Sequence, residues 1–239
     1  MFEPRIESPK EDENRMPKRI VLTILVAVGA LLAWVVWTGA VAFLRAPGMV
    51  ADLERAGGLP LSPSDLPKSR VCALLAVDDP TFYLHQGIGL FDGPPGHTTI
   101  TQAIGKGLFF NGFDPGFLRH RKIRLMVAAW AFDRRISKEM QLRVFLNRAY
   151  FGSMDERGVL GFPAAARAYF GKPLDRVSDR EYLGLLAMLE APSRYHVQRQ
   201  PQANAERVAR LEMRIKEACR EGCFEGESPI PCPGSPSSH

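Results

Sequence analysis

Two adjacent acids end an apolar stretch of this sequence, within the segment AVDDPTFYLHQG at residues 76–87. Asp78 and Asp79 lie a few residues before His85, and carboxylates beside a histidine can accept, hold or donate a proton. Pro80 offers a simpler interpretation, because proline ends a helix and would leave both acids on a solvated last turn. The stretch alone leaves both interpretations open.

Three more clusters of polar and basic residues follow in order along the chain. The clusters contain, in turn, Thr98, Thr99, Gln102 and Lys106; then Arg121, Lys122 and Arg124; and then the segment NRAYFG at residues 147–152. Residues 101–150 hold ten Lys and Arg against three Asp and Glu, whereas the whole chain has a net charge of only +5. Fixed cations of this kind could neutralise a diphosphate, although a basic window is equally typical of a solvated helix face.

The first structural element along the chain is an uncharged segment of 25 residues near the N-terminus. Residues 20–44 would extend about 37 Å as a helix, enough to cross a hydrocarbon core of about 30 Å. We therefore expect a transmembrane helix at 20–44; the competing interpretation is a cleaved signal peptide. Lys18 and Arg19 precede the segment and Arg45 follows it, which predicts a cytoplasmic tail at 1–19 and the rest of the chain outside the cytoplasm.

The remaining chain has mainly helical periodicity. The segment at residues 45–66 is rich in Gly, Pro and Ser and predicts a connector, residues 67–222 predict a helical domain, and residues 223–239 predict a disordered tail. Helices are expected to end at the acid pair and to cover residues 99–110 and 117–134, with Ser137 capping the next one. Pro163 and Gly171 should bracket another helix, and Ser178 with Glu181 forms a capping box. We see no alternating strand pattern.

Four cysteines leave several possibilities open. Cys72 lies in an apolar helical stretch and is expected to be a packed thiol. A Cys219–Cys223 bridge has poor geometry on one helix, whereas a Cys223–Cys232 bridge crosses a loop-like segment more easily. The chain has no CxxC or HExxH spacing, so no metal-binding residues are proposed.

The clusters together resemble family 51 glycosyltransferases, the peptidoglycan polymerase domains of bifunctional penicillin-binding proteins and monofunctional transglycosylases. The matching blocks read DDPTFYLHQG, PGHTTITQAIGKG, RKIRL and LNRAYFG, followed by the long segment from GFPAAARAYFGK to APSRY. The resemblance covers roughly residues 66–201, and five blocks in the family's order make it specific.

The resemblance implies a mainly α, lysozyme-like helical transglycosylase domain behind a single transmembrane helix. It also implies polymerisation of a lipid-linked disaccharide pentapeptide at the outer face of the bacterial inner membrane, with a general base on the acceptor's 4-hydroxyl. By the matching positions, the catalytic candidates are Asp78 and Asp79. Substrate-binding candidates are Phe82, His85, Thr98, Thr99, Gln102, Lys106, Arg121, Lys122 and Arg124. Mg²⁺ or Mn²⁺ on the diphosphate, membrane lipid and other cell-wall synthesis proteins are the implied partners; nucleic acid is not.

The chain departs from the family pattern at several positions. Asp78 stands where the family has its first Glu, and Leu125 stands where the third block has its second Glu. Ala103 and Gly107 replace a Gln and an Asn of the second block, and the segment between His85 and Thr98 is shorter than the family's. Three hypotheses follow: a glycosyltransferase with an altered site, a pseudoenzyme that binds precursor or partner enzymes, and a hydrolase of glycan strands. A hydrolase needs an acid as well as a base or nucleophile; only Asp78, Asp79 and Asp133 are placed to serve, and none replaces the acid lost at Leu125.

Overall fold

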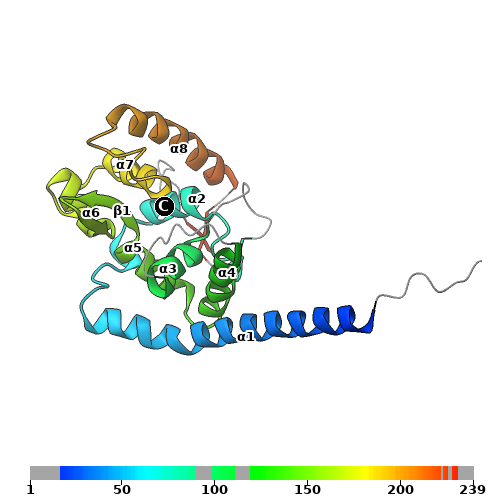
Figure 1. Cartoon of the computed structure of the whole chain (residues 1–239). Coiled ribbons are helices and arrows are strands. Elements are labelled where there is room, and N and C mark those ends of the chain that lie inside the picture. Colours follow the sequence, from blue (N-terminus) through cyan, green and yellow to red (C-terminus); the bar gives the residue numbers. More distant parts are fainter. Residues whose placement is uncertain (1–16, 90–97, 111–118, 222, 226–227, 231–239) are drawn as a thin grey trace, which may run out of the picture. The chain divides into compact units, whose positions relative to one another are not determined.

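The first helix is much longer than the predicted membrane segment. The computed structural model describes residues 17–89, 98–110, 119–221, 223–225 and 228–230, with side chains omitted at 119–121 and from 219 onward. Helix α1 covers Lys18–Arg55, and by length and composition it could cross a membrane (Figure 1). A signal sequence near the N-terminus would meet the same criteria of length and composition. The contacts divide the chain into two units, one ending at Trp37 and the other beginning at Thr38.

The expected connector at residues 45–66 is wrong in its first half, because α1 continues through Pro47 to Arg55. Ala46 and Val50 are buried in the core of the second unit, and this packing outweighs the hydrogen bond lost at the proline. Gly57 then ends the helix with a left-handed φ of 66°, and the N–H of Gly58 donates to the carbonyl of Leu53. This is the hydrogen-bond pattern of a Schellman motif.

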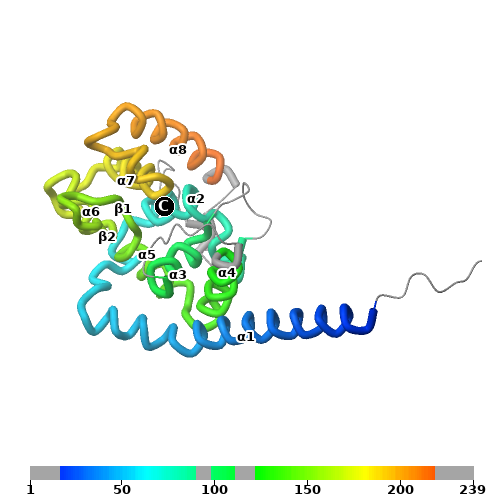
Figure 2. Tube along the Cα trace, viewed as in Figure 1, coloured from blue at the N-terminus to red at the C-terminus, as the bar shows by residue number. Residues whose placement is uncertain are grey.

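Helix α2 (Lys68–Asp78) is the central element of the second unit (Figures 1 and 2). Seven consecutive residues, Val71–Val77, are buried, so the helix is covered on all sides. It packs against α7 (Asp179–Glu190) and α8 (Pro201–Glu221). A helix buried all round places its last residue, Asp78, at the edge of the core.

Three helices form the neighbouring layer. Helix α3 (Ile100–Phe109) packs against α4 (Arg119–Asp133) and α5 (Lys138–Arg148). Helix α6 is Phe162–Phe170, and two 3₁₀ turns, η1 (Pro63–Asp65) and η2 (Leu174–Arg176), complete the helical elements described. The mainly α fold class is confirmed.

The predicted helix ends also match the structure. Thr99 and Gln102 form a capping box on α3, and the hydroxyl of Ser137 caps α5. Pro163 lies in the first turn of α6 and Gly171 ends that helix in the left-handed conformation. Ser178 with Glu181 forms the capping box expected for α7.

Two short hairpins were not predicted. Strand β1 (Tyr150–Met154) pairs with β2 (Arg157–Leu160), and β3 (Cys223–Glu225) pairs with β4 (Ser228–Ile230). The first hairpin turns at Asp155 and Glu156, both with positive φ, and these residues lack the Asn-Gly signal that marks such turns. The second hairpin corrects the prediction of a tail disordered from residue 223; residues 231–239 lie outside the described part of the chain.

The prediction that Cys72 is a packed thiol is wrong. Cys72 is fully buried in α2, and it forms a disulfide. The three other cysteines of the chain are Cys219, Cys223 and Cys232. The apolar pattern around Cys72 predicted its burial correctly, but burial does not distinguish a thiol from a disulfide.

Candidate active site

The two acids at the end of α2 differ in what surrounds them. Asp79 is buried, and its carboxylate accepts hydrogen bonds from Nε2 of His85 at 2.9 Å and from the backbone N–H of Ile100 at 2.9 Å. Ile100 is the first residue of α3, where backbone N–H groups have no partner within the helix. Asp79 therefore connects the end of α2 to the start of α3.

His85 has both ring nitrogens engaged. Its Nδ1 accepts a hydrogen bond from the N–H of Gly87 at 3.0 Å, so Nε2 carries the hydrogen that is donated to Asp79. Gly87 has a φ of 79°, and a Cβ placed on it would lie 2.6 Å from the carbonyl oxygen of Ala129 in α4. Phe82 is also buried, beneath Nζ of Lys138 at 4.6 Å from the ring centroid. The turn after α2 is thus fixed against its neighbours.

Asp78 is half-buried and is not engaged in this way. Within the described part of the chain, its carboxylate accepts no hydrogen bond and forms no ion pair. Burial, and after it the negative charge of Asp79, raise the pKa of Asp78 to about 7 against the opposing charges of Arg214 and Lys106. A carboxylate with a pKa near neutrality can exchange a proton at physiological pH.

The start of α3 carries the second predicted cluster. Thr99 donates a hydrogen bond to the carbonyl of Gly87 at 2.9 Å, and its hydroxyl accepts from the N–H of Gln102 at 3.1 Å. The Gln102 side chain accepts from the N–H of Thr99 at 3.2 Å. Both residues are buried and make helix-capping contacts. Thr98 differs, because its hydroxyl accepts a hydrogen bond from Nζ of Lys106 at 3.3 Å.

Lys106 is half-buried and lies close enough to Asp78 for the two charges to interact. Burial lowers the pKa of Lys106; Asp78 opposes this change, and the nearby charge of Lys122 adds to it. The structure therefore brings three predicted residues, from α2, α3 and α4, into one charged group. We call Asp78, Lys106 and Lys122 the charged cluster.

The remaining basic candidates are placed differently. Arg124 is exposed, and its guanidinium lies 5.2 Å from the ring centroid of Phe110. The side chain of Arg121 lies outside the described part of the chain. Leu125 packs on α3, because a Cβ placed on Gly105 would lie 3.2 Å from its Cδ1. The position of the family's second acid thus lies beside the residue that precedes Lys106.

The family model described as Transglycosylase matches residues 49–216, which is well over half of the chain. The chain belongs to the transglycosylase family. The matched range begins within α1 and ends in α8, and it contains the charged cluster.

Individual relatives of this transglycosylase chain include two penicillin-binding proteins. Penicillin-binding protein 1F of Bacillus subtilis is 34% identical over 66% of the chain and 23% of its own length. Penicillin-binding protein 1B of Escherichia coli is 31% identical over 60% of the chain and 18% of its own length. A Cupriavidus necator protein named "Putative transglycosylase" is 26% identical over 86% of the chain and 92% of its own length. The chain thus spans about a fifth of the length of the two penicillin-binding relatives.

One charged residue near Asp78 was not predicted from the sequence. Arg214 lies on α8, beyond the end of the recognised blocks at about residue 201, and its charge opposes the rise in the pKa of Asp78. The signal that could have found it is the helical spacing of Val208, Leu211 and Ile215, which places residue 214 on the edge of the buried face.

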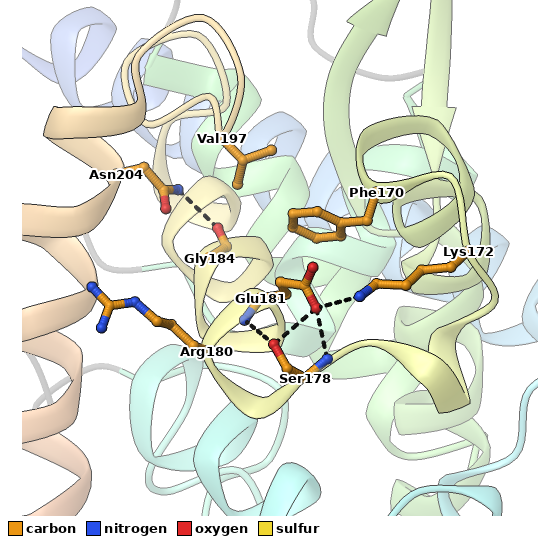
Figure 3. Close-up of a pocket in the computed structure, with 8 residues that line it drawn as sticks. All are labelled: Phe170, Lys172, Ser178, Arg180, Glu181, Gly184, Val197 and Asn204. Carbon is orange, nitrogen blue, oxygen red and sulfur yellow. Dashed lines mark hydrogen bonds and ion pairs between the residues drawn. The ribbon is translucent and has the colours of Figure 1, made fainter.

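A hollow on the surface of the transglycosylase domain is lined by none of the predicted catalytic or substrate-binding residues. It lies between the end of α6 and the start of α7, and Phe170, Lys172, Ser178, Arg180, Glu181, Gly184, Val197 and Asn204 line it (Figure 3). The Glu181 carboxylate accepts hydrogen bonds from Lys172 and from Ser178 (Figure 3), and these contacts lower its pKa to about 2. In this hollow Ser178 and Glu181 form the capping box of α7, Lys172 pairs with Glu181, and Asn204 donates to the carbonyl of Gly184, so we assign the hollow no role in chemistry.

Proposed function

We propose that this chain is a membrane-anchored peptidoglycan glycosyltransferase that polymerises lipid-linked disaccharide pentapeptide into glycan strands. Membership of the transglycosylase family supports the reaction class. The contrast between the two acids supports the assignment of the base: Asp79 is engaged by His85 and Ile100, whereas Asp78 has its carboxylate available and a pKa of about 7.

In the proposed reaction, the Asp78 carboxylate removes the proton from the acceptor's 4-hydroxyl as its oxygen attacks the anomeric carbon of the donor. The bond from that carbon to the diphosphate breaks, and the polyprenyl diphosphate leaves with the electron pair. Lys106 and Lys122 supply positive charge for the leaving diphosphate, which carries more negative charge as the bond breaks. Protonated Asp78 then returns its proton to water.

Two departures from the family pattern, at Asp78 and Leu125, bear on the proposed reaction. Aspartate at residue 78 is one methylene shorter than the family's glutamate, so the acceptor must approach α2 more closely than a longer base would require. Leu125 supplies neither a proton acceptor nor a cation ligand. Among the described residues, no three His, Cys, Asp or Glu side chains gather to hold a metal ion. A resident metal does not fit these residues, and Mg²⁺ or Mn²⁺ is proposed only as a counterion that the substrate's diphosphate itself would hold.

The proposed location is the bacterial inner membrane, with the N-terminus in the cytoplasm and the domain outside. Helix α1 is long and apolar enough to cross a bilayer. The disulfide of Cys72 supports an external domain, because disulfides persist in oxidising compartments. Membrane lipid and other cell-wall synthesis proteins are the proposed partners.

A polymerisation assay with purified full-length chain and lipid-linked precursor tests the reaction, with and without Mg²⁺. We expect glycan polymer from the wild type and a loss of about 10²-fold or more from Asp78→Asn, which keeps the shape of the side chain but cannot take a proton. Asp175→Asn, at an exposed position on η2, is the matched control and should retain full activity. Absence of polymer from the wild type under both conditions would contradict the proposal.

The second candidate is a pseudoenzyme that binds the precursor or a partner enzyme, and Leu125 is the observation that favours it. Its side chain lies against Gly105 of α3, at the position where the family pattern has its second Glu. If the wild type is inactive and Leu125→Glu creates polymer, the pseudoenzyme is supported. If the wild type is already active, it is not. The hydrolase gains no support, because Asp133 is paired with Lys138 and accepts a hydrogen bond from Gln141.

A further inference from the structure

Helix α8 presents one face to the rest of the domain, and that face carries two arginines. Its buried residues recur at helical spacing, and they are Asn204, Val208, Leu211 and Ile215. Arg207 and Arg214 are half-buried on the same side, seven residues or about two turns apart. The charges of these two arginines therefore act on residues of the helices that pack against α8.

The two helices on which α8 packs each end in an acidic residue. Helix α8 packs on both α7 and α2. Arg207 pairs with Glu190, the last residue of α7, at 2.5 Å. Asp78 is the last residue of α2, and the charge of Arg214 acts on it. In the described part of the chain Arg214 forms no ion pair of its own, and a cation at the end of α2 is also favoured by that helix's dipole.

A disulfide of Cys72 also ties α2 to another part of the chain. Cys72 lies on α2 six residues before Asp78 and is fully buried in a disulfide. The other three cysteines of the chain lie in the last turn of α8 or after it. Strands β3 and β4, which follow α8, also contact α2. A bond from Cys72 to any of the three ties α2 to the last turn of α8 or to the segment that follows α8.

We propose that Arg214 is a positioning residue for Asp78, and that the Cys72 disulfide holds the helix that carries it in place. The role rests on the proposed function, since it concerns the proposed base. Charged groups that act on Asp78 are Asp79, Lys106 and Arg214. Once Lys106 is engaged by a diphosphate, Arg214 is the cation left to keep the Asp78 carboxylate ionised. Its charge acts on Asp78 from α8, whereas the proposed substrate cations, Lys106 and Lys122, come from α3 and α4.

The experiment measures the titration of the Asp78 side-chain carboxyl by NMR in the full-length chain in detergent micelles. We expect Arg214→Ala to raise the midpoint by about 0.5–1 pH unit, because an opposing charge is removed. Arg214→Lys should restore most of the difference. Arg210→Ala removes an exposed arginine from the same helix and should leave the midpoint unchanged. The acid limb of the polymerisation rate should move upward by the same amount as the carboxyl midpoint.

Reduction tests the disulfide. A dithiol such as dithiothreitol gives two electrons and two protons to the bond, leaves two cysteine thiols, and is itself oxidised to a cyclic disulfide. Reduced wild type should shift in the same direction as Arg214→Ala, and reduction of Arg214→Ala should add nothing further. Circular dichroism confirms that each form is folded.

Three results would overturn parts of the inference in different ways. An unchanged Asp78 midpoint in folded Arg214→Ala refutes the positioning role. A shift in Arg214→Ala without any shift on reduction refutes the role of the disulfide. If both shifts occur but the wild type makes no polymer, the positioning role stands and the proposed function fails, because the NMR measurement does not depend on activity.

Discussion

At the scale of single residues, the two neighbouring acids Asp78 and Asp79 differ in the hydrogen bonds that their carboxylates accept. Both carboxylates lie at the end of one helix. The Asp79 carboxylate accepts hydrogen bonds from His85 and from the first N–H of α3, whereas the Asp78 carboxylate accepts none from the described residues. A half-buried carboxylate without such bonds retains its proton to higher pH, and the pKa of Asp78 is raised to about 7. Asp78 can therefore exchange a proton near neutral pH.

This difference predicts how stability depends on pH. Since the pKa of Asp78 is raised to about 7, the folded state keeps a proton that the unfolded state loses as pH rises above about 4. The cost grows between these two values and is complete above pH 7. The full rise would correspond to roughly 4 kcal/mol, and half-burial reduces our expectation to about 2 kcal/mol.

Asp78→Asn removes this cost, because an amide does not ionise. We expect the variant and the wild type to unfold with equal free energy near pH 4, and the variant to be more stable by about 2 kcal/mol at pH 8. Thermal unfolding of both proteins across this pH range measures the difference. The exposed Asp175→Asn should follow the wild type at every pH, and equal stability of Asp78→Asn and wild type at pH 8 would contradict the raised pKa.

At the scale of elements, the sequence predicted the helices and their ends well because these depend on local chemistry. Thr99, Ser137 and Ser178 each cap the helix that was expected, since a hydroxyl with a backbone N–H two or three residues later is a local contact. The continuation of α1 past Pro47 was missed, since it depends on burial of Ala46 and Val50 by residues far along the chain.

The residues of the candidate site also fall into those that the sequence predicted and those that depend on contacts between distant parts of the chain. Asp78 and Lys106 could be found because the family pattern names their positions, and the charged cluster followed. Arg214 and the bonding of Cys72 could not, because each depends on how α8 and the segment after it pack on α2. Contacts between residues more than a hundred positions apart leave no local signal in one sequence.

The turn after α2 supports a prediction that compares two glycines. Both Gly87 and Gly57 have a left-handed φ, but a Cβ on Gly87 would lie 2.6 Å from the backbone of α4, whereas a Cβ on Gly57 would meet open space. We expect Gly57→Ala to cost about 1 kcal/mol for the conformation alone, and Gly87→Ala to cost about 3 kcal/mol or more. Chemical denaturation measures both free energies. Equal costs would show that the turn is not held against α4.

At the scale of the whole molecule, α1 belongs to two units with different surroundings. Ala42 packs with Ala128 and Ala131 of α4, and Val50 belongs to the main core. Every buried residue of α1 lies after Thr38, and the residues before it are exposed or only half-buried. One helix thus combines an apolar stretch suited to a bilayer with a stretch that completes the domain.

Two truncations separate these roles. Within the described part of the chain, removal of residues 1–37 takes away no buried side chain, so the remaining chain should unfold with a free energy within about 0.5 kcal/mol of the full chain. Removal of residues 1–57 also deletes Ala42, Ala46 and Val50, and the ion pair between Glu54 and Arg143. That loss exposes the core beneath them and should cost about 3 kcal/mol or more.

Denaturant unfolding compares the two truncated chains with the full chain, and flotation with lipid vesicles reports membrane attachment. We expect both truncated chains to lose flotation, because the apolar stretch of residues 20–37 is absent from each. Only the shorter chain should lose stability. Equal stability of the two truncated chains would mean that Thr38–Arg55 adds nothing to the core, whereas a large loss on removing 1–37 would place the boundary between the two units earlier in α1.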